Sequence, residues 1–179
     1  MISSPAPLHA LLRCHPATPA GVALALSVEV HPVGEALRLR YVLRGEIAAL
    51  RIPEPTAPGP ADGLWQHTCF EAFVANEGEA AYREFNFSPS GQWAAYRFAA
   101  ERERDAPGES RHPVSLEAPH TVVAPDTLVL TARIPFAAPA RGLRGLRGCA
   151  RIGHAIAGIV AQHPDWKVSA RPARPARCK

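Results

Sequence analysis

The chain has 179 residues, 47% of them hydrophobic and 20% charged, which suits one compact domain with a sizeable core. The formal net charge is +4, but five of the twenty basic residues follow Asp165, whereas all sixteen acidic residues lie at or before it. The basicity therefore belongs largely to the tail, and without a recognisable motif it does not indicate a nucleic-acid partner. Nineteen Pro and thirteen Gly disfavour long helices and favour an all-β fold.

Alternating hydrophobic residues predict strands in the first third of the chain. Residues 8–12 are expected to begin an edge strand. Residues 22–31 and 37–44 alternate with a period of two, around a turn at Gly34 and Glu35. The inward residues are Val22, Leu24, Leu26, Val28 and Val30, then Leu37, Leu39, Tyr41 and Leu43, while Arg38, Arg40 and Arg44 point outward. Residues 47–52 are expected to add a short strand, and the Pro-rich residues 53–60 a loop outside any sheet interior.

Three more strands are predicted between residues 64 and 98, where aromatic residues gather. In the first run Trp65, His67, Cys69, Glu71 and Phe73 are expected to share a face, and in the second run Tyr82, Glu84, Asn86 and Ser88 are expected to do so. In the third run, Trp93, Ala95 and Arg97 are expected on one face and Ala94, Tyr96 and Phe98 on the other. Turn-forming residues separate the runs at 76–78 and 89–91. The three strands are therefore expected to form an antiparallel meander.

Pairing of these strands in chain order would bring polar side chains together on one sheet face. The expected ligand contacts are Glu71, Glu84, Asn86 and Arg97, flanked by Trp65 and Trp93. Carboxylates, an amide and a guanidinium match pairs of hydroxyl groups, and flat rings match the C–H face of a sugar. The alternative is purely structural, because a Glu–Arg pair across strands is often an ordinary ion pair and Trp usually belongs to the core.

The last third of the chain predicts a loop and further strands. Residues 101–112 are charged and expected to form an exposed loop, and residues 114–116, 121–123 and 127–134 are expected to form strands. Arg141, Arg144, Arg147 and Arg151 lie in a Gly-rich link that is expected to be a solvated loop, with contact to phosphate as the less favoured alternative. In total, about eight strands predict an antiparallel β-sandwich, immunoglobulin-like or jelly-roll-like.

Three neighbouring segments carry a resemblance: Asp62 to Phe73, then Glu84-Phe85-Asn86-Phe87-Ser88-Pro89-Ser90-Gly91, then Tyr96-Arg97-Phe98. Together they resemble bacterial DOMON-like proteins. These are single-domain β-sandwiches similar to the family 9 carbohydrate-binding modules. The resemblance implies a small ligand, sugar or haem, held on one sheet face, with Trp65, Glu71, Glu84, Asn86 and Arg97 as contacts and no established catalytic residues. It extends more weakly from about Leu8 to Ser169, so family membership indicates the fold better than the function.

The sequence departs from this family at its C-terminal end. Relatives typically finish with a strand that bears Tyr-Trp and then a Pro-Asp-Phe-His stretch, whereas this chain ends in Ala-Arg-Pro repeats. Arg151-Ile152-Gly153 and residues 157–160 still resemble the penultimate strand. We therefore expect a sandwich domain at 1–169 and a basic, disordered tail at 170–179, without a recognisable closing strand.

Other chemistries are less well supported by the residues. His67 and Cys69 lack further metal ligands nearby, and the four Cys show no zinc spacing. Glu71 and Glu84 could serve glycoside hydrolysis, but Arg97 beside them would lower their pKa and remove the acid partner. Haem ligation by a Met and His pair is disfavoured because the only Met is Met1.

The favoured function is therefore non-catalytic binding of a carbohydrate or a similar polar small molecule, with no cofactor and no metal. A haem-binding or hydrolytic domain and a protein-docking scaffold stay open as alternatives. No signal-peptide pattern and no run of eighteen apolar residues is seen, so a cytoplasmic protein without a membrane partner is expected.

Overall fold

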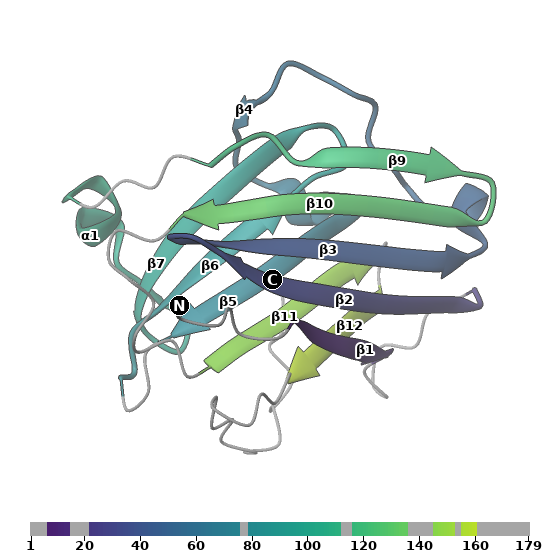
Figure 1. Cartoon of the computed structure of the whole chain (residues 1–179). Helices are drawn as coiled ribbons and strands as arrows, with labels where there is room; N and C mark the ends of the chain where they lie inside the picture. Colours follow the sequence, from purple (N-terminus) through teal and green to yellow (C-terminus); the bar gives the residue numbers. More distant parts are fainter. Residues whose placement is uncertain are drawn as a thin grey trace.

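The structure is a computed structural model that describes residues 7–14, 22–75, 79–111, 116–135, 145–152 and 155–160. Two mainly antiparallel sheets pack face to face, as the predicted all-β sandwich requires (Figure 1). We name them the front sheet, in the order β1-β2-β3-β10-β9, and the back sheet, in the order β4-β7-β6-β5-β11-β12 with β8 beside β7. The described residues form twelve strands rather than about eight, because several short strands were not predicted.

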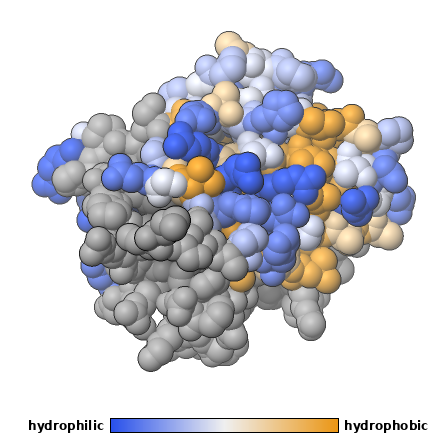
Figure 2. All heavy atoms as spheres, in the orientation of Figure 1, coloured by the Kyte–Doolittle hydropathy of each residue, from blue (hydrophilic) through white to orange (hydrophobic). Residues whose placement is uncertain are grey.

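The strands of the front sheet are β1 (Leu8–Cys14), β2 (Leu24–Val33), β3 (Ala36–Gly45), β10 (Thr127–Pro135) and β9 (His120–Ala124). The alternation predicted for β2 and β3 is confirmed, since Val30, Leu39 and Leu43 are fully buried and Arg38 and Arg44 are exposed. In Figure 2 the solvent face of this sheet is hydrophilic in its middle and apolar toward one side. The strands predicted at 121–123 and 127–134 are confirmed as β9 and β10.

The first strand is not the edge strand that was predicted. Leu8 to Leu12 pair with β2, and Arg13 and Cys14 then pair with β12 of the back sheet. The strand thus passes from one sheet to the other and closes one side of the sandwich. The free edges in the described part of the chain lie instead at β9 and along β7.

The back sheet contains the predicted meander as β5 (Cys69–Ala75), β6 (Tyr82–Phe87) and β7 (Gln92–Ala100), which pair antiparallel in chain order. The turn before β7 is confirmed, with Gly91 at φ 93°, a left-handed conformation that favours glycine. The remaining strands are β4 (Gly59–Pro60), β8 (Glu103–Arg104), β11 (Gly145–Ile152) and β12 (Ala155–Val160). Residues 76–78 lie outside the described residues.

Several segments differ from their predictions for local reasons. Residues 47–49 form a 3-10 helix, η1 (Ile47–Ala49), rather than a strand, because Leu50 N–H bonds back to Ile47 O. A second 3-10 helix, η2 (Leu64–Gln66), replaces the predicted start of β5 and closes with a bond from His67 N–H to Leu64 O. His67 is therefore exposed while Cys69 is buried, so the expected shared strand face of these two residues is wrong.

Two predicted loops also contain regular structure. The expected exposed loop at 101–112 contains β8 and a short helix, α1 (Ala106–Arg111). Arg147 and Arg151 lie in β11, where they pair with Phe73 and Cys69, rather than in a Gly-rich link. Arg141, Arg144, most of the strand predicted at 114–116 and the tail at 170–179 lie outside the described residues.

The main core fills the space between the two sheets. The front sheet contributes residues such as Val30, Leu39 and Tyr41, and the back sheet contributes Phe70 and Phe87. Burial of such side chains supplies about 1.5 to 3 kcal/mol each. A second, smaller cluster lies on the outer face of the back sheet, where Leu64, Cys69, Ala94 and Tyr96 pack together under η2.

The described part of the chain shows no helix that is long and apolar enough to span a membrane.

Candidate functional site

Three of the predicted contact residues lie on the outer face of the back sheet, as expected. Glu71 pairs with Asn86 across β5 and β6, and Glu84 stands two residues from Asn86 on the same strand. Asn86 Nδ2 donates a hydrogen bond of 3.1 Å to Glu84 Oε1. Glu71 and Asn86 are only 3% and 0% exposed, so this polar row is closed over rather than open to solvent. Its role in ligand binding stays a prediction.

The polar row also shows how burial changes its chemistry. Burial raises the pKa of Glu84, and the Asn86 hydrogen bond and the charge of Arg104 oppose that rise. Asn86 Oδ1 is fully buried and has no hydrogen-bond partner among the described residues. A buried oxygen without a donor is costly, so a water molecule or a ligand hydroxyl would be stabilised there.

The predicted convergence is wrong for Arg97 and Trp93, which lie on the opposite face of the sheet. The register pairs Glu84 with Tyr96 and pairs Arg83 with Arg97, so Arg97 cannot share the face of Glu84. Its Nε instead donates a 2.8 Å bond to Asp105 Oδ2. Trp93 packs partly against the main core.

Trp65, the remaining predicted contact, lies in η2 instead of on a strand. Its side chain is partly exposed. Neither Trp65 nor Trp93 is fully buried, so each retains surface that a ligand could cover.

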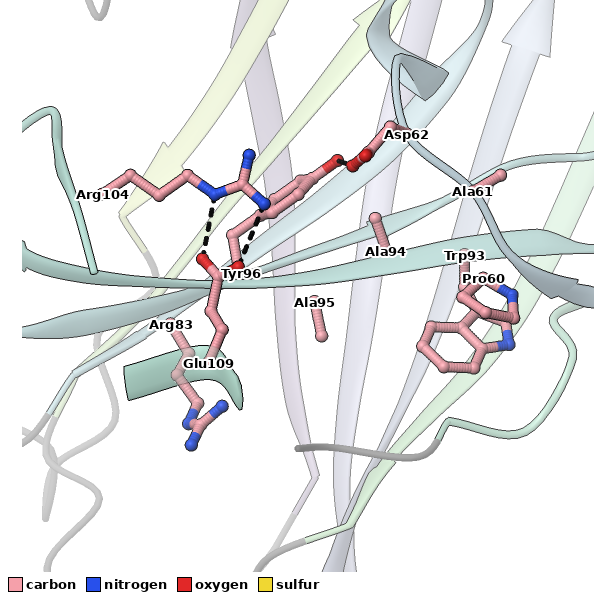
Figure 3. A pocket seen from close by; sticks show the side chains of 10 residues that line it. All are labelled: Pro60, Ala61, Asp62, Arg83, Trp93, Ala94, Ala95, Tyr96, Arg104 and Glu109. Atoms are coloured by element: carbon pink, nitrogen blue, oxygen red, sulfur yellow. Dashed lines mark hydrogen bonds and ion pairs between the residues drawn. The ribbon is translucent and has the colours of Figure 1, made fainter. Parts of the chain in front are cut away.

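A pocket of about 380 Å³ opens at the edge of β7. Figure 3 shows Trp93 and Pro60 at one end, Arg104 and Glu109 at the other, and the small side chains of Ala94 and Ala95 between them. The full lining is Pro60, Ala61, Asp62, Arg83, Trp93, Ala94, Ala95, Tyr96, Arg104 and Glu109. Among the six predicted contact residues, only Trp93 lines it.

Tyr96 organises one wall of this pocket. Its hydroxyl donates a 2.7 Å hydrogen bond to Asp62 Oδ1, which fixes the segment between β4 and η2 against β7. The guanidinium carbon of Arg104 lies 4.5 Å from the centre of the Tyr96 ring, within the range of a cation–π contact. Burial, followed by the bond to Asp62, raises the pKa of the Tyr96 hydroxyl, so it stays a hydrogen-bond donor at neutral pH.

Arg104 and Glu109 form the end of the pocket away from Trp93 and are joined by two parallel hydrogen bonds (Figure 3). Arg104 Nε donates to Glu109 Oε1 and Arg104 Nη2 donates to Glu109 Oε2, each with a donor–acceptor distance of 3.0 Å. Such bidentate pairs hold both side chains in one geometry. Burial opposes ionisation of Glu109, but the bonds from Arg104 and from the Arg97 N–H outweigh it and lower the pKa of this carboxyl.

The helix α1 is placed against β7 by Asp105 and Arg97. Asp105 caps the helix, since its Oδ1 accepts a 2.9 Å bond from Gly108 N–H and its own N–H donates to Arg97 O. The hydrogen bond from Gly108 N–H lowers the pKa of Asp105 most, and the bond from the Arg97 side chain lowers it further. A Cβ on residue 108 would collide with the Asp105 side chain and lie 2.8 Å from Arg97 Cδ, so a larger residue there would displace one or both of these side chains. Arg97 therefore acts indirectly, by positioning the helix that carries Glu109.

Sequence reasoning missed Asp62, Tyr96, Arg104 and Glu109 as lining residues. One local signal was present, because Asp105 followed by Pro107 and Glu109 is typical of a helix start. The pocket combines an indole, a phenol, two carboxylates and two guanidinium groups, a set suited to a polar ligand with an apolar face. The described residues contain no group of three or more His, Cys, Asp or Glu side chains that could hold a metal ion.

No protein-family model matches the sequence, and no curated protein matches it significantly. Among solved structures, the chain is similar to a provisionally named carbohydrate-binding protein from Bacteroides uniformis, with a TM-score of 0.54 and 19% identity over 84% of this chain and 74% of that one. A family 9 carbohydrate-binding module from Caldicellulosiruptor kristjanssonii, solved in complex with cellotriose, has a TM-score of 0.48 and 11% identity over 90% of this chain and 88% of that one. At this level of identity, the similarity to the Bacteroides protein shows a shared β-sandwich fold.

Proposed function

We propose that this protein is a non-catalytic, DOMON-like carbohydrate-binding domain and that the pocket at the edge of β7 holds the sugar. The observation that carries the proposal is the lining of that pocket, where Trp93 stands opposite the Arg104–Glu109 pair across a floor of small side chains (Figure 3). An indole offers an apolar platform to the C–H face of a sugar ring. Carboxylate and guanidinium groups accept from and donate to its hydroxyls.

The size and rigidity of the site support the same function. A volume of about 380 Å³ lies within the range of small-ligand sites. Asp62 and Glu109 are already held by Tyr96 and Arg104, so a ligand meets groups whose geometry is set in advance. The fold shared with the carbohydrate-binding protein from Bacteroides uniformis agrees with this proposal.

Calorimetric titration with neutral mono- and disaccharides of glucose, galactose, mannose and xylose tests the proposal. Trp93→Ala should weaken binding by at least about tenfold, or about 1.4 kcal/mol, whereas Trp65→Ala, a partly exposed Trp outside the pocket, should not. Asp62→Ala should also weaken binding, and Glu35→Ala, an exposed acid in the β2–β3 turn, serves as its control.

Two results would count against the proposal in different ways. Absence of heat with every sugar would reject carbohydrate binding. Loss of binding in Trp65→Ala, with Trp93→Ala folded and unaffected, would move the site away from the pocket and toward the polar row of Glu71, Glu84 and Asn86. Unfolding curves of each variant establish that the protein is folded before affinities are compared.

A further inference from the structure

The outer edge of β7 is hydrogen-bonded on both sides of a single residue. Trp93 O accepts a 2.9 Å bond from Ala61 N–H, and Arg97 O accepts a 2.8 Å bond from Asp105 N–H. Arg97 N–H also donates to Glu109 Oε1 at 2.9 Å. Alternate residues of a strand direct both backbone groups to the same side, so residues 93, 95 and 97 face the outer edge. Ala95 therefore directs its N–H and C=O away from β6.

No described strand occupies the edge position beside Ala95. The pairing with β4 ends at Trp93, and the pairing with β8 begins at Phe98. Ala95 is also one of the residues that line the pocket, which opens along this same edge of β7. Buried or half-buried backbone groups without a partner favour a ligand or water that supplies one.

The length of this gap excludes a peptide strand as the occupant. Added strands in peptide recognition run over several residues of an open edge. Here Ala61 and Asp105 already occupy the edge on either side, which leaves one residue free. The occupant must be small and must supply one acceptor and one donor close together. Two neighbouring hydroxyl groups of a sugar do so, since each hydroxyl can donate and accept.

The charges around the gap favour a neutral occupant. The pocket is lined by two carboxylates, Asp62 and Glu109, and two guanidinium groups, Arg83 and Arg104, so their formal charges cancel. Arg104 is held by Glu109 in a bidentate pair. An anionic ligand gains no net attraction from these four groups, and separating the Arg104–Glu109 pair or approaching the two carboxylates carries an electrostatic cost.

We infer that the Ala95 N–H and C=O, exposed at the one-residue gap in the β7 edge, bind adjacent hydroxyls of a neutral sugar and discriminate against its acidic counterpart. This inference rests on the proposed carbohydrate-binding function and adds a recognition element to it. Backbone groups cannot be identified by side-chain motifs, which is why the sequence carried no sign of this contact.

Amide hydrogen exchange measured by NMR on the intact protein tests the gap before any sugar is added. The Ala95 amide should exchange at least about tenfold faster than the amides of Ala94 and Tyr96, which face β6. An Ala95 amide that is as protected as its two neighbours would show that the gap is filled, and this would overturn the inference without bearing on carbohydrate binding.

The same measurement is then repeated with glucose, galactose and mannose, and with glucuronate and galacturonate as matched anions. Saturating neutral sugar should slow exchange at Ala95 and leave Ala94 unchanged, and the uronates should bind at least about tenfold more weakly than their neutral counterparts. A sugar that gives calorimetric heat but does not protect Ala95 overturns the inference alone. If no sugar gives heat, the proposed function fails as well. Equal or tighter binding of the uronates would contradict the neutral preference.

A pair of substitutions at the same residue separates backbone from side chain. Ala95→Pro removes the N–H at a position on the sheet edge, where proline is tolerated, and should reduce affinity at least about tenfold. Ala95→Gly keeps the N–H and should retain affinity within about threefold. Equal affinity of folded Ala95→Pro and wild type would contradict the inference. If Ala95→Pro does not fold, the exchange measurement on the wild type decides the question.

Discussion

Removing the Tyr96 hydroxyl should loosen one wall of the pocket, the wall formed by Asp62 in the segment between β4 and η2. In Tyr96→Phe, Asp62 loses a 2.7 Å hydrogen bond, and hydrogen bonds to charged groups contribute about 1.5 to 3 kcal/mol. Asp62 is exposed, so water can replace the lost donor and the net loss falls to about 1 kcal/mol. With a urea slope of about 2 kcal/mol per molar, the unfolding midpoint should fall by about 0.5 M.

Urea unfolding followed by tryptophan fluorescence measures this change. A double-mutant cycle with Asp62→Ala isolates the pair, and the coupling energy should reach about 0.5 to 1 kcal/mol. The same variant should bind sugar more weakly because Asp62 is no longer held in place. A coupling energy near zero, with sugar affinity unchanged, would show that the bond between Tyr96 and Asp62 does not organise the pocket.

Three further predictions concern stability. Burial raises the pKa of Glu84, so the stability of the wild type should decline as pH rises from below the ordinary pKa of 4.5 through the raised value. Glu84→Gln, whose side-chain oxygen can still accept the hydrogen bond from Asn86, should lack this decline. Unfolding midpoints of both proteins, measured across this pH range, provide the comparison. Tyr41→Phe removes a buried 3.0 Å bond to Glu71 O that links the sheets and should cost about 1 to 1.5 kcal/mol in chemical unfolding; an unchanged midpoint contradicts it. Gly108→Ala should displace α1 and lower both thermal stability and sugar affinity, and normal values for both would show that the helix tolerates a side chain there.

The fold was predictable wherever a strand alternates over a long run. Val30 and Leu39 were assigned to the core because strands that face water on one side must alternate, and both are fully buried. The 3-10 helix at Leu64–Gln66 was missed because alternating residue types continue through it. Backbone hydrogen bonds such as that from His67 N–H to Leu64 O form the 3-10 helix at these residues, and the alternation of residue types gives no sign of them.

Of the four polar residues predicted to converge on one sheet face, Glu71, Glu84 and Asn86 do so and Arg97 does not, for a specific physical reason. Alternation within β7 correctly placed Arg97 opposite Tyr96, but alternation does not specify which residues of the next strand share their face. The register sets that relation, and it pairs Glu84 with Tyr96. Arg97 was therefore assigned to the wrong set of neighbours, although its strand and its orientation within the strand were predicted.

The pocket could not be predicted from local pattern at all. Its walls come from residues 60–62 and residues 104–109, two segments far apart in the sequence that β4 and β8 bring to the same edge of β7. Helix α1 has only six residues, too few for a hydrophobic period, and contains a proline and a glycine. Only the start of the helix at Asp105 could have been predicted from the sequence.

A crystal structure of the protein with a bound neutral sugar would show directly whether the sugar occupies the pocket at the edge of β7. We expect a sugar ring against the indole of Trp93, with adjacent hydroxyls within hydrogen-bond distance of Ala95 N and O and with the Arg104–Glu109 pair intact. A sugar bound over Trp65 or along Glu71 and Asn86, with the edge of β7 unoccupied, would contradict it.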